Sequence, residues 1–345
     1  MAIPPTPVSL RAKPAPGRLA VTGIGNALLD VIVRDHRSLI DELALVKGSM
    51  TLVDLGRAGE IYEAMGPTLQ VSGGSAANTI AGVAALGGTS GYIGKVGDDE
   101  FGEVFAHDLR ALGVELDLAI ADGDGVQTGR CHVFVSNDAQ RTMATYLGAA
   151  NQLTERDVPL DLIARSEIVY IEGYLFDLPP AKAAIREVVR VAHEHDAMVA
   201  LSLSDTFCVE RHRPDFLDLV TTDVDVLLSN EHEALSLFQT PSLERVFDAV
   251  DELGVLAVVT VGPAGADVST VHGVVRVPAA EVDDVVDQNG AGDLFASGFL
   301  FGLAIGADPL EAAQLGSLCA GEVISHLGAR PEDDLEKLAI VAGLL

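Results

Sequence analysis

The sequence predicts an α/β fold in which a mostly parallel β-sheet is flanked by helices. Two observations lead to this prediction. Short runs rich in β-branched residues alternate with longer segments of helical spacing, which is typical of βαβ units and parallel sheets. The chain also has 345 residues, of which 48% are hydrophobic, so it is long enough for one large α/β core or two smaller ones.

The ordered part of the chain is predicted to begin near Leu19. Residues 19–33 have the pattern of a β-strand, a glycine-bearing turn and a second apolar strand. Asp308 predicts a helix start, because proline follows it and Glu311 lies three residues further on, as in a capping box. Further strands are predicted at residues 167–171, 198–203, 224–228 and 255–261, and further helices at residues 79–86, 180–195 and 294–305.

Composition excludes several classes of partner. The chain has 22 basic and 51 acidic residues, a formal net charge of −29, and no basic cluster, so nucleic acid and anionic membranes are not expected to bind. Cys131, Cys208 and Cys319 form no CxxC pair, which argues against a disulfide framework and fits a reducing cytoplasm. No export signal or membrane-spanning run is recognisable, so a cytoplasmic location is expected.

The most informative motif is the segment DQNGAGD at residues 287–293, directly before a long apolar run. It predicts a glycine-rich turn that enters a buried helix. Free N–H groups at such a helix start, together with the helix dipole, bind anions such as phosphate. The carboxylate of Asp293 in the first turn would then act as a base beside that phosphate, which is the arrangement of a phosphoryl-transfer site. The alternative is a tight helix entry with an acidic N-terminal residue.

Two segments, residues 31–55 and 116–147, interrupt the α/β alternation and are strand-prone. We expect them to pair into a small β-sheet lid over one edge of a domain that spans residues 19–345. A mobile cover suits phosphoryl transfer, because water must be excluded from the bound phosphate. The proline-rich residues 1–18 are expected to form a flexible leader.

Three further sites admit both a functional and a structural interpretation. Asn78 follows a glycine-rich turn, which either binds a substrate hydroxyl or simply allows close helix packing. Asp30 lies within an apolar strand, where it either meets the vicinal hydroxyls of a sugar or binds backbone at a strand end. Asn230 and Glu233 either form a capping box or contribute oxygen ligands to a magnesium–water shell.

Other nucleotide-binding motifs are missing. The sequence has no GxxxxGK[ST] motif, and the segment from Gly23 to Leu28 lacks the third glycine of the dinucleotide fingerprint and precedes a strand. The hypothesis of a dehydrogenase therefore loses its main support.

Five motifs in order resemble the ribokinase-like (phosphofructokinase-B type) carbohydrate and nucleoside kinases over residues 20–330. They are Gly73-Gly74 with Asn78, residues 94–99 (GKVGDD), Asn230-x-x-Glu233, Thr260-x-Gly262-x-x-Gly265, and residues 287–293. The resemblance implies a Rossmann-like α/β domain with a small β-sheet lid, ATP as phosphate donor, and Mg²⁺.

The resemblance also implies roles for individual residues. Asp293 resembles the catalytic base, and the N–H groups of Gly290, Ala291 and Gly292 resemble the anion hole. Asp30, Gly74 and Asn78 resemble the residues that bind the hydroxyl groups of the acceptor, and Glu172 resembles a further residue near the acceptor. Asn230 and Glu233 resemble the pair that orders magnesium and phosphate, and Thr260, Gly262 and Gly265 resemble the loop on the ATP side.

The acceptor is less well defined by the sequence. Gln288 departs from the family, which usually has threonine there, and the change leaves the glycines and the base in place. Residues 140–151 resemble the adenosine-kinase branch, and residues 174–176 (YLF) offer aromatic and apolar surface for a base. Arg141 either reaches the phosphates or is a solvated hairpin charge.

We therefore expect a nucleoside as acceptor, with adenosine first and a free sugar such as ribose or fructose as the alternative. A non-catalytic protein that binds nucleotide or sugar on the same fold is a further alternative. It is disfavoured because the base, the glycines and the Asn230 and Glu233 pair are all present. Family members include monomers and homodimers, and both remain open here.

Overall fold

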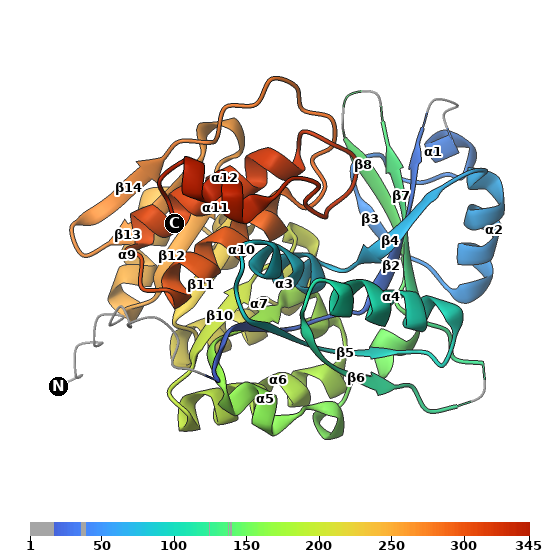
Figure 1. The fold of residues 1–345 in the computed structure, drawn as a ribbon, viewed down its shortest axis with the longest axis horizontal. Helices are drawn as coiled ribbons and strands as arrows, with labels where there is room; N and C mark the ends of the chain where they lie inside the picture. The colour runs from blue at the N-terminus through green and yellow to red at the C-terminus, as the bar shows by residue number, and fades with distance from the viewer. Residues whose placement is uncertain (1–16, 36–38, 124, 137, 139) are drawn as a thin grey trace.

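The computed structural model describes residues 17–35, 39–123, 125–136, 138 and 140–345, and within them the chain forms two sheets (Figure 1). The large sheet has nine strands in the order β14-β13-β12-β11-β10-β9-β1-β5-β6, and all of them run in the same direction except β13, which is antiparallel to both of its neighbours. Its strands are β1 (Leu19–Ile24), β5 (Ser90–Val96), β6 (Glu115–Ile120), β9 (Ser166–Glu172), β10 (Met198–Ser202), β11 (Val226–Asn230), β12 (Leu256–Thr260), β13 (Ala266–Thr270) and β14 (Gly273–Val277).

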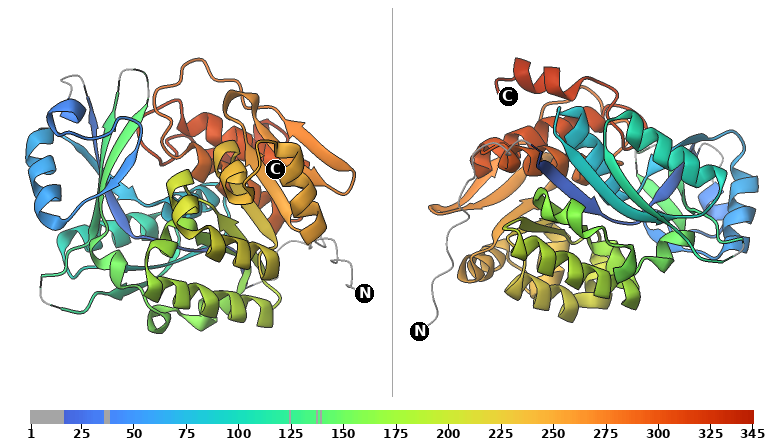
Figure 2. Two further views of the ribbon diagram at one scale, coloured as in Figure 1. Left: turned by 180° about the vertical axis from the view of Figure 1, so that it is seen from behind. Right: turned by 60° about the horizontal axis from the view of Figure 1, so that its bottom comes forward.

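Helices cover both faces of the large sheet, and each face has its own buried apolar cluster (Figure 2). The central strands are apolar on both faces because both are covered, as expected for a parallel sheet. One face packs against α3 (Ser75–Ala85), α4 (Glu100–Ala111), α10 (Ala291–Ala304), α11 (Pro309–Val323) and α12 (Leu335–Val341). The other packs against α5 (Leu160–Ala164), α6 (Pro179–Glu194), α7 (Thr206–Thr222), α8 (Glu231–Phe238) and α9 (Leu243–Leu253).

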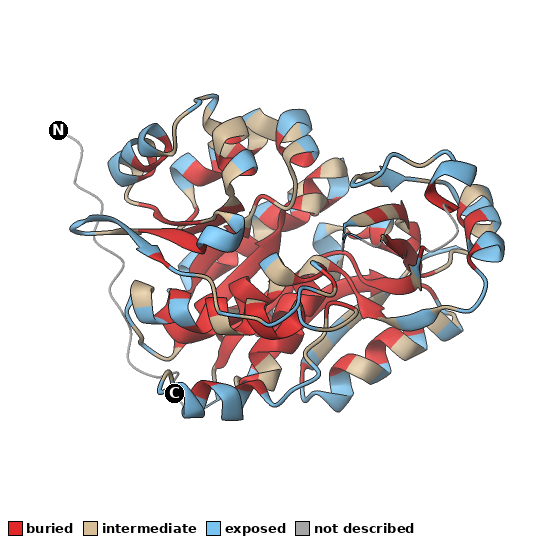
Figure 3. Ribbon diagram, turned by 90° about the horizontal axis from the view of Figure 1, so that it is seen from above, coloured by how far each residue is buried: buried red, intermediate tan, exposed pale blue. Residues whose placement is uncertain are grey.

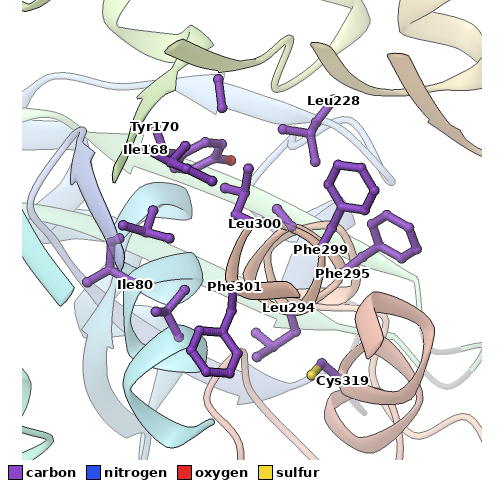
Figure 4. Packing of buried hydrophobic residues seen from close by; sticks show 14 of the residues in the cluster. Ile80, Ile168, Tyr170, Leu228, Leu294, Phe295, Phe299, Leu300, Phe301 and Cys319 are labelled. Atoms are coloured by element: carbon purple, nitrogen blue, oxygen red, sulfur yellow. The ribbon is translucent and has the colours of Figure 1, made fainter. Parts of the chain in front are cut away.

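Helix α10 is the central helix of its layer. Every residue from Leu294 to Ala304 is buried, because α10 lies between the sheet, α3 and α11. Figure 4 shows Phe295 and Phe299 close to Leu228 of the sheet, with Leu300 toward Tyr170. This packing fixes the position of the first turn of α10.

The small sheet lies at one side of the large domain and has five described strands in the order β3-β8-β7-β2-β4 (Figure 1). Its outer face packs against α1 (Leu39–Glu42) and α2 (Leu55–Met65), whereas its inner face forms a separate apolar cluster. Its strands are β2 (Leu28–Arg34), β3 (Met50–Leu52), β4 (Leu69–Gly73), β7 (Gly129–Val135) and β8 (Arg141–Tyr146).

Most of the predicted elements are present, with shifts of a few residues at their ends. The strand, turn and strand at residues 19–33 are β1 and β2, and Asp308 caps α11 through a capping box with Glu311. The predicted strands at residues 167–171, 198–203, 224–228 and 255–261 are β9, β10, β11 and β12. The predicted α/β class with a second, smaller sheet is therefore confirmed.

The composition of the small sheet was predicted wrongly in two places. Residues 116–120 belong to β6 at the edge of the large sheet. Because an edge strand is half-exposed, its apolar and polar residues alternate as they would in a lid strand. Strand β4, at residues 69–73, joins the small sheet although neither predicted segment includes it. Residues 39–42 within the first segment are helical.

Of the predicted leader, residues 1–18, all but Gly17 and Arg18 lie outside the described residues, and Arg18 pairs with Glu167 at 2.9 Å. None of the helices in the described part of the chain is both long and apolar enough to traverse a bilayer. Figure 3 shows the buried strands at the centre of the molecule and the exposed faces of the outer helices around them.

Candidate active site

A cavity of about 380 Å³ lies where the large sheet meets the small sheet. In the large sheet β1 and β9 are neighbours, and the strands that follow them in the chain are added on opposite sides, β5 next to β1 and β10 next to β9. Ligands of open α/β sheets bind at the carboxyl ends of the strands beside such a switch point. Residues after β1, β9, β10 and β11 and the last residue of β12 all contribute to the lining. The predicted site residues that line this cavity are Asp30, Gly74, Asn78, Glu172, Asn230, Glu233, Thr260, Gly290, Ala291, Gly292 and Asp293.

The glycine-rich turn before α10 has the predicted form. Gly290 is the N-cap with φ 74°, and a Cβ atom there would lie 2.8 Å from the backbone of Ala329, so only glycine fits. A Cβ atom at Gly292 would meet nothing within 4 Å, which leaves the N-terminus of α10 open to the cavity. The first N–H groups of a helix lack partners within it, so this turn can receive an anion.

The turn is held from behind by Asp287, which is fully buried. Its Oδ1 atom accepts the Asn289 N–H at 2.9 Å, and its Oδ2 atom accepts the Gly328 N–H at 3.0 Å. These hydrogen bonds join the turn to the segment after α11 and fix its shape.

The Asp293 carboxylate, in the first turn of α10, is oriented by α3. Its Oδ1 atom accepts the Ser75 hydroxyl at 2.7 Å, and its Oδ2 atom accepts the Asn78 amide at 2.9 Å. Burial raises the pKa of Asp293 above the usual aspartate range, while these two hydrogen bonds lower it. A carboxylate that is fixed, partly buried and more basic than usual is suited to accept a proton near neutral pH.

Asp30 lies on the inner face of the small sheet, on the same side of β2 as Leu28 and Ile32. It is 6% exposed, and among the described residues no hydrogen-bond donor contacts its carboxylate. Burial raises its pKa to about 7, although the charges of Arg141 and Arg330 lower it. A buried carboxylate with free acceptor atoms beside a cavity is prepared for hydroxyl donors.

Several buried polar atoms that line the cavity also lack partners among the described residues. They are Oδ1 of Asn26, Oδ1 of Asn78, Oγ of Ser229 and Nδ2 of Asn289. Buried polar atoms are normally hydrogen-bonded, so these atoms indicate a polar ligand or ordered water in the cavity.

Glu172 lines the cavity, but its oxygens are already engaged. Oε1 accepts the Asn26 amide at 2.8 Å, and Oε2 accepts the Ala76 N–H at the start of α3 at 2.9 Å. Burial raises the pKa of Glu172 to about 7, against the effect of these hydrogen bonds. Glu172 therefore lies beside the cavity, where its carboxylate holds the Asn26 side chain and the start of α3 in place.

Asn230 and Glu233 form a capping box at the start of α8. The Asn230 Oδ1 atom accepts the Glu233 N–H at 2.9 Å, and Glu233 accepts the Asn230 N–H at 3.0 Å. The structural interpretation is therefore confirmed, and both side chains also line the cavity. Burial raises the pKa of Glu233 to about 7. Within the described ranges, no group of three or more histidine, cysteine, aspartate or glutamate residues could hold a metal ion.

Of the predicted ATP-side loop, only Thr260 lines the cavity. Gly262 is exposed, whereas Gly265 is buried with φ 99°, and a Cβ atom there would overlap with the Val277 carbonyl oxygen of β14. The tight hairpin packing accounts for Gly265 without any ligand.

The predicted aromatic surface at residues 174–176 is only partly present. Tyr174 lines the cavity, but Leu175 and Phe176 are buried in the core beneath the sheet, where Phe176 packs 4.4 Å from the Phe216 ring centroid. The apolar wall of the cavity comes instead from the inner face of the small sheet. It consists of Leu28, Met50, Leu52, Cys131, Val133, Met143 and Leu147.

Sequence reasoning missed two residues of the site, Asn26 and Ser75, and one arginine behind it, Arg330. Asn26 and Ser75 lie within segments that drew attention for their glycines, so their polar side chains were the available signal. Arg330, whose charge acts on Asp30 and Asp293, carries no local signal because its partners lie more than 250 residues away in sequence.

A glycine turn at a helix N-terminus, a basic carboxylate in its first turn and unpaired hydroxyl acceptors define a phosphotransferase that acts on an alcohol group. The model of the pfkB family carbohydrate kinases matches residues 49–336, and the chain belongs to this family. Membership in this kinase family implies ATP as the phosphate donor.

Relatives include both nucleoside and sugar kinases. The crystal structure of adenosine kinase from Sinorhizobium meliloti is 45% identical, with TM-score 0.90 over 94% of this chain and 99% of that one. The structure of a probable sugar kinase from Rhizobium etli CFN 42 is 42% identical, with TM-score 0.91 over 95% and 100%. Adenosine kinase of Saccharomyces cerevisiae is 29% identical over 92% of this chain and 97% of its own length. The chain is therefore similar to kinases of both acceptor classes.

Proposed function

We propose that the chain transfers the γ-phosphoryl group of ATP to the primary hydroxyl group of a nucleoside, with adenosine as the preferred acceptor. The observation that carries this proposal is the division of the cavity. The large domain contributes Asn78 and Asp293, whereas the facing inner surface of the small sheet is mostly apolar and carries Asp30 beside Leu28. A nucleoside has the same division, a hydroxyl-rich ribose and a flat base that packs well on apolar side chains.

The ribose would bind between Asp30 of the small sheet and the two asparagines Asn26 and Asn78. The two carboxylate oxygens of Asp30 match two vicinal hydroxyl donors, and the free Oδ1 atoms of Asn26 and Asn78 accept further O–H groups. Because Asn78 also donates to Asp293, a ribose bound there would bring its primary hydroxyl close to the proposed base. Such positioning lowers the entropic part of the barrier.

In the reaction, Asp293 accepts the proton of the primary hydroxyl as its oxygen attacks the γ-phosphorus in line. The N–H groups of Gly290, Ala291 and Gly292 and the dipole of α10 stabilise the charge on the transferring group. The hydrogen bonds from Ser75 and Asn78 hold the Asp293 carboxylate toward the acceptor. ADP leaves with the bridging oxygen.

The charge of the cavity bears on how ATP binds. Among the described residues, five carboxylates line it, and Arg141 is the single lysine or arginine. We assign Asn230 and Glu233 to a water-mediated magnesium shell, which the oxygen chemistry and the burial of Glu233 fit. Magnesium, when bound, would neutralise part of the negative charge of the phosphates. Thr260 and the following loop with Gly262 and Gly265 would flank the nucleotide.

The small sheet acts in this proposal as the lid over the acceptor. Its inner face already forms the apolar wall of the cavity, so a bound base would lie between the lid and the large domain. Lid closure excludes water from the phosphoryl group.

A free sugar is the second candidate acceptor. The hydroxyl acceptors Asp30, Asn26 and Asn78 would serve ribose or fructose equally well, and one close relative is a probable sugar kinase. The apolar wall, however, would then face the sugar without a matching surface, which favours the nucleoside.

The deciding experiment measures magnesium-dependent ADP release from ATP with adenosine, other nucleosides, ribose and fructose, for the wild type and Asp293→Asn. Turnover that is greatest with adenosine and lost in the variant is the expected result. Turnover with a sugar alone would reassign the acceptor. Binding of ATP and acceptor without ADP release from any pair would replace the kinase proposal with a non-catalytic binding protein.

A further inference from the structure

One arginine spans the junction between the small sheet and the large domain. Strand β4 and helix α3 are separated only by Gly74. The Arg330 guanidinium contacts both sides of this junction. Its Nε atom donates to the Ser72 carbonyl oxygen at 3.0 Å and its Nη2 atom to the Ser72 hydroxyl at 3.2 Å, while Nη1 donates to the Ala77 carbonyl oxygen at 2.6 Å. A single side chain thus connects the end of β4 with the first turn of α3.

Both sides of the junction carry residues of the site. In the small sheet, Val71 of β4 lies opposite Asp30 of β2 in the strand register. On the other side, Ser75 and Asn78 of α3 hold the carboxylate of Asp293. The connection through Arg330 therefore links the strands that carry the hydroxyl acceptor to the helix that orients the base.

The surroundings keep Arg330 charged and fixed. Burial lowers its pKa to about 10, while Asp30, Asp108 and Asp293 favour the charged form. At neutral pH the guanidinium is thus protonated. Asp108 of α4 also accepts the Ser72 N–H at 3.2 Å, so the end of β4 is held from two directions.

We propose that Arg330 is a positioning residue for the acceptor, which sets the placement of Asp30 relative to Asp293 by clamping Ser72 to Ala77. Arg330 does not line the cavity, so it acts through β4 and α3 and touches neither substrate. The roles of Asp30 and Asp293 in this statement rest on the proposed function.

The geometry requires arginine in particular. Three acceptors on two segments are met by three different nitrogen atoms of one planar guanidinium. A lysine ammonium is a single point on a flexible stem, so it keeps the charge but cannot hold both segments in this arrangement. Arg330→Lys therefore tests the loss of the hydrogen bonds between the two segments while the positive charge is kept.

The test compares Arg330→Lys and Arg330→Met with Arg186→Met, a control whose side chain is 69% exposed on α6. Initial rates are measured while acceptor and ATP are varied separately. We expect the acceptor KM to rise about 10- to 100-fold in both Arg330 variants, as for loss of hydrogen bonds from a charged group. The ATP KM is expected to stay within about twofold, because the donor site does not depend on the junction. Equal rises in both KM values, or wild-type values in Arg330→Lys, would overturn the proposal.

Amide hydrogen exchange at residues 69–78 tests the clamp without turnover. Faster exchange there in Arg330→Lys than in the wild type and Arg186→Met is expected, and unchanged exchange would overturn the clamp even if no acceptor is phosphorylated. Arg330→Lys serves alone if Arg330→Met does not fold. Absence of ADP release in the wild type would contradict the proposed function, while the exchange result would still decide the role of Arg330.

Discussion

Arg141 of the small sheet lies against Asp287 of the large domain, with its Nε atom 3.4 Å from the Asp287 Oδ1 atom. Its Nη2 atom also donates to the Gln288 carbonyl oxygen at 3.3 Å. Asp287 shapes the glycine turn of the proposed phosphate site. The small sheet is therefore connected directly to the proposed anion-binding loop, and Arg141 is not a solvated hairpin charge in this arrangement.

Arg141→Gln should weaken this tie and lower kcat. Loss of a charge-assisted contact between the two parts favours open arrangements, in which the phosphate site is less protected, and a fall of about tenfold is expected. Steady-state kinetics measure the effect. The control is Arg57→Gln, which removes a half-exposed arginine of α2 that pairs with Glu60 at 2.8 Å and donates to the Leu43 carbonyl oxygen, away from the cavity. Unchanged kcat in Arg141→Gln would show that the tie does not contribute to turnover.

Asp293→Asn should fold normally and lose most activity. The amide keeps the size of the carboxylate and can still bond with Ser75, but it cannot accept the proton of the attacking hydroxyl. Loss of a positioned base typically lowers the rate about 10²- to 10⁴-fold. Single-turnover rates of ADP formation at saturating substrates provide the measurement, with circular dichroism as the check on folding. Wild-type turnover would remove Asp293 from the role of base.

The parts of the site that the sequence predicted well are local. Residues 287–293 form a contiguous turn and helix start whose chemistry follows from residue order, and Asp30 is conspicuous as a carboxylate in an apolar strand. The parts that it did not predict depend on contacts between distant segments. Arg330 finds Ser72 and Ala77 across the fold, and such pairing leaves no local pattern.

The same distinction holds for the fold. Alternating strands and helices identify the class, because each element's pattern reflects which of its faces is covered. The pattern does not say to which of the two sheets a strand belongs. Strand β6 alternates because it is the edge of the large sheet, and β4 is largely exposed before it reaches the glycine turn, so the sequence assigned neither to its sheet.

Met143→Ala should discriminate between nucleoside and sugar acceptors. Met143 lies on the apolar wall and is only partly buried, so its truncation removes contact surface for a base with limited cost to folding. We expect kcat/KM for adenosine to fall about tenfold, the usual scale for lost apolar contacts in a pocket. The value for ribose should change by less than about twofold, since a free sugar lacks the flat base that Met143 is proposed to contact.

The matched control for this comparison is Leu69→Ala, which truncates an apolar side chain of the same sheet that is 45% exposed and lies outside the cavity. Both variants are measured with both acceptors. If Met143→Ala affects adenosine and ribose equally, the wall does not contact a base, and the sugar-kinase alternative gains.

Asp30→Asn should make the ligand-free protein more stable at pH 8 but not at pH 4. Burial raises the pKa of Asp30 in the folded protein to about 7, above the ordinary value of about 3.9 in an unfolded chain. Between these two values the folded state binds more protons than the unfolded state. The contribution of Asp30 to stability therefore falls as the pH rises from about 4 to about 7, and stays low above that range.

The asparagine variant lacks this titration. Its gain in unfolding free energy over the wild type should be near zero at pH 4 and on the order of a few kcal/mol at pH 8. Thermal or urea unfolding across this range provides the measurement. Because the chain carries a net charge of −29, removal of any carboxylate also relieves self-repulsion, and the exposed Asp161→Asn corrects for that general effect. A gain in Asp30→Asn that matches Asp161→Asn at every pH would mean that Asp30 is ionised at low cost in the empty site, and its readiness for hydroxyl donors would then need another explanation.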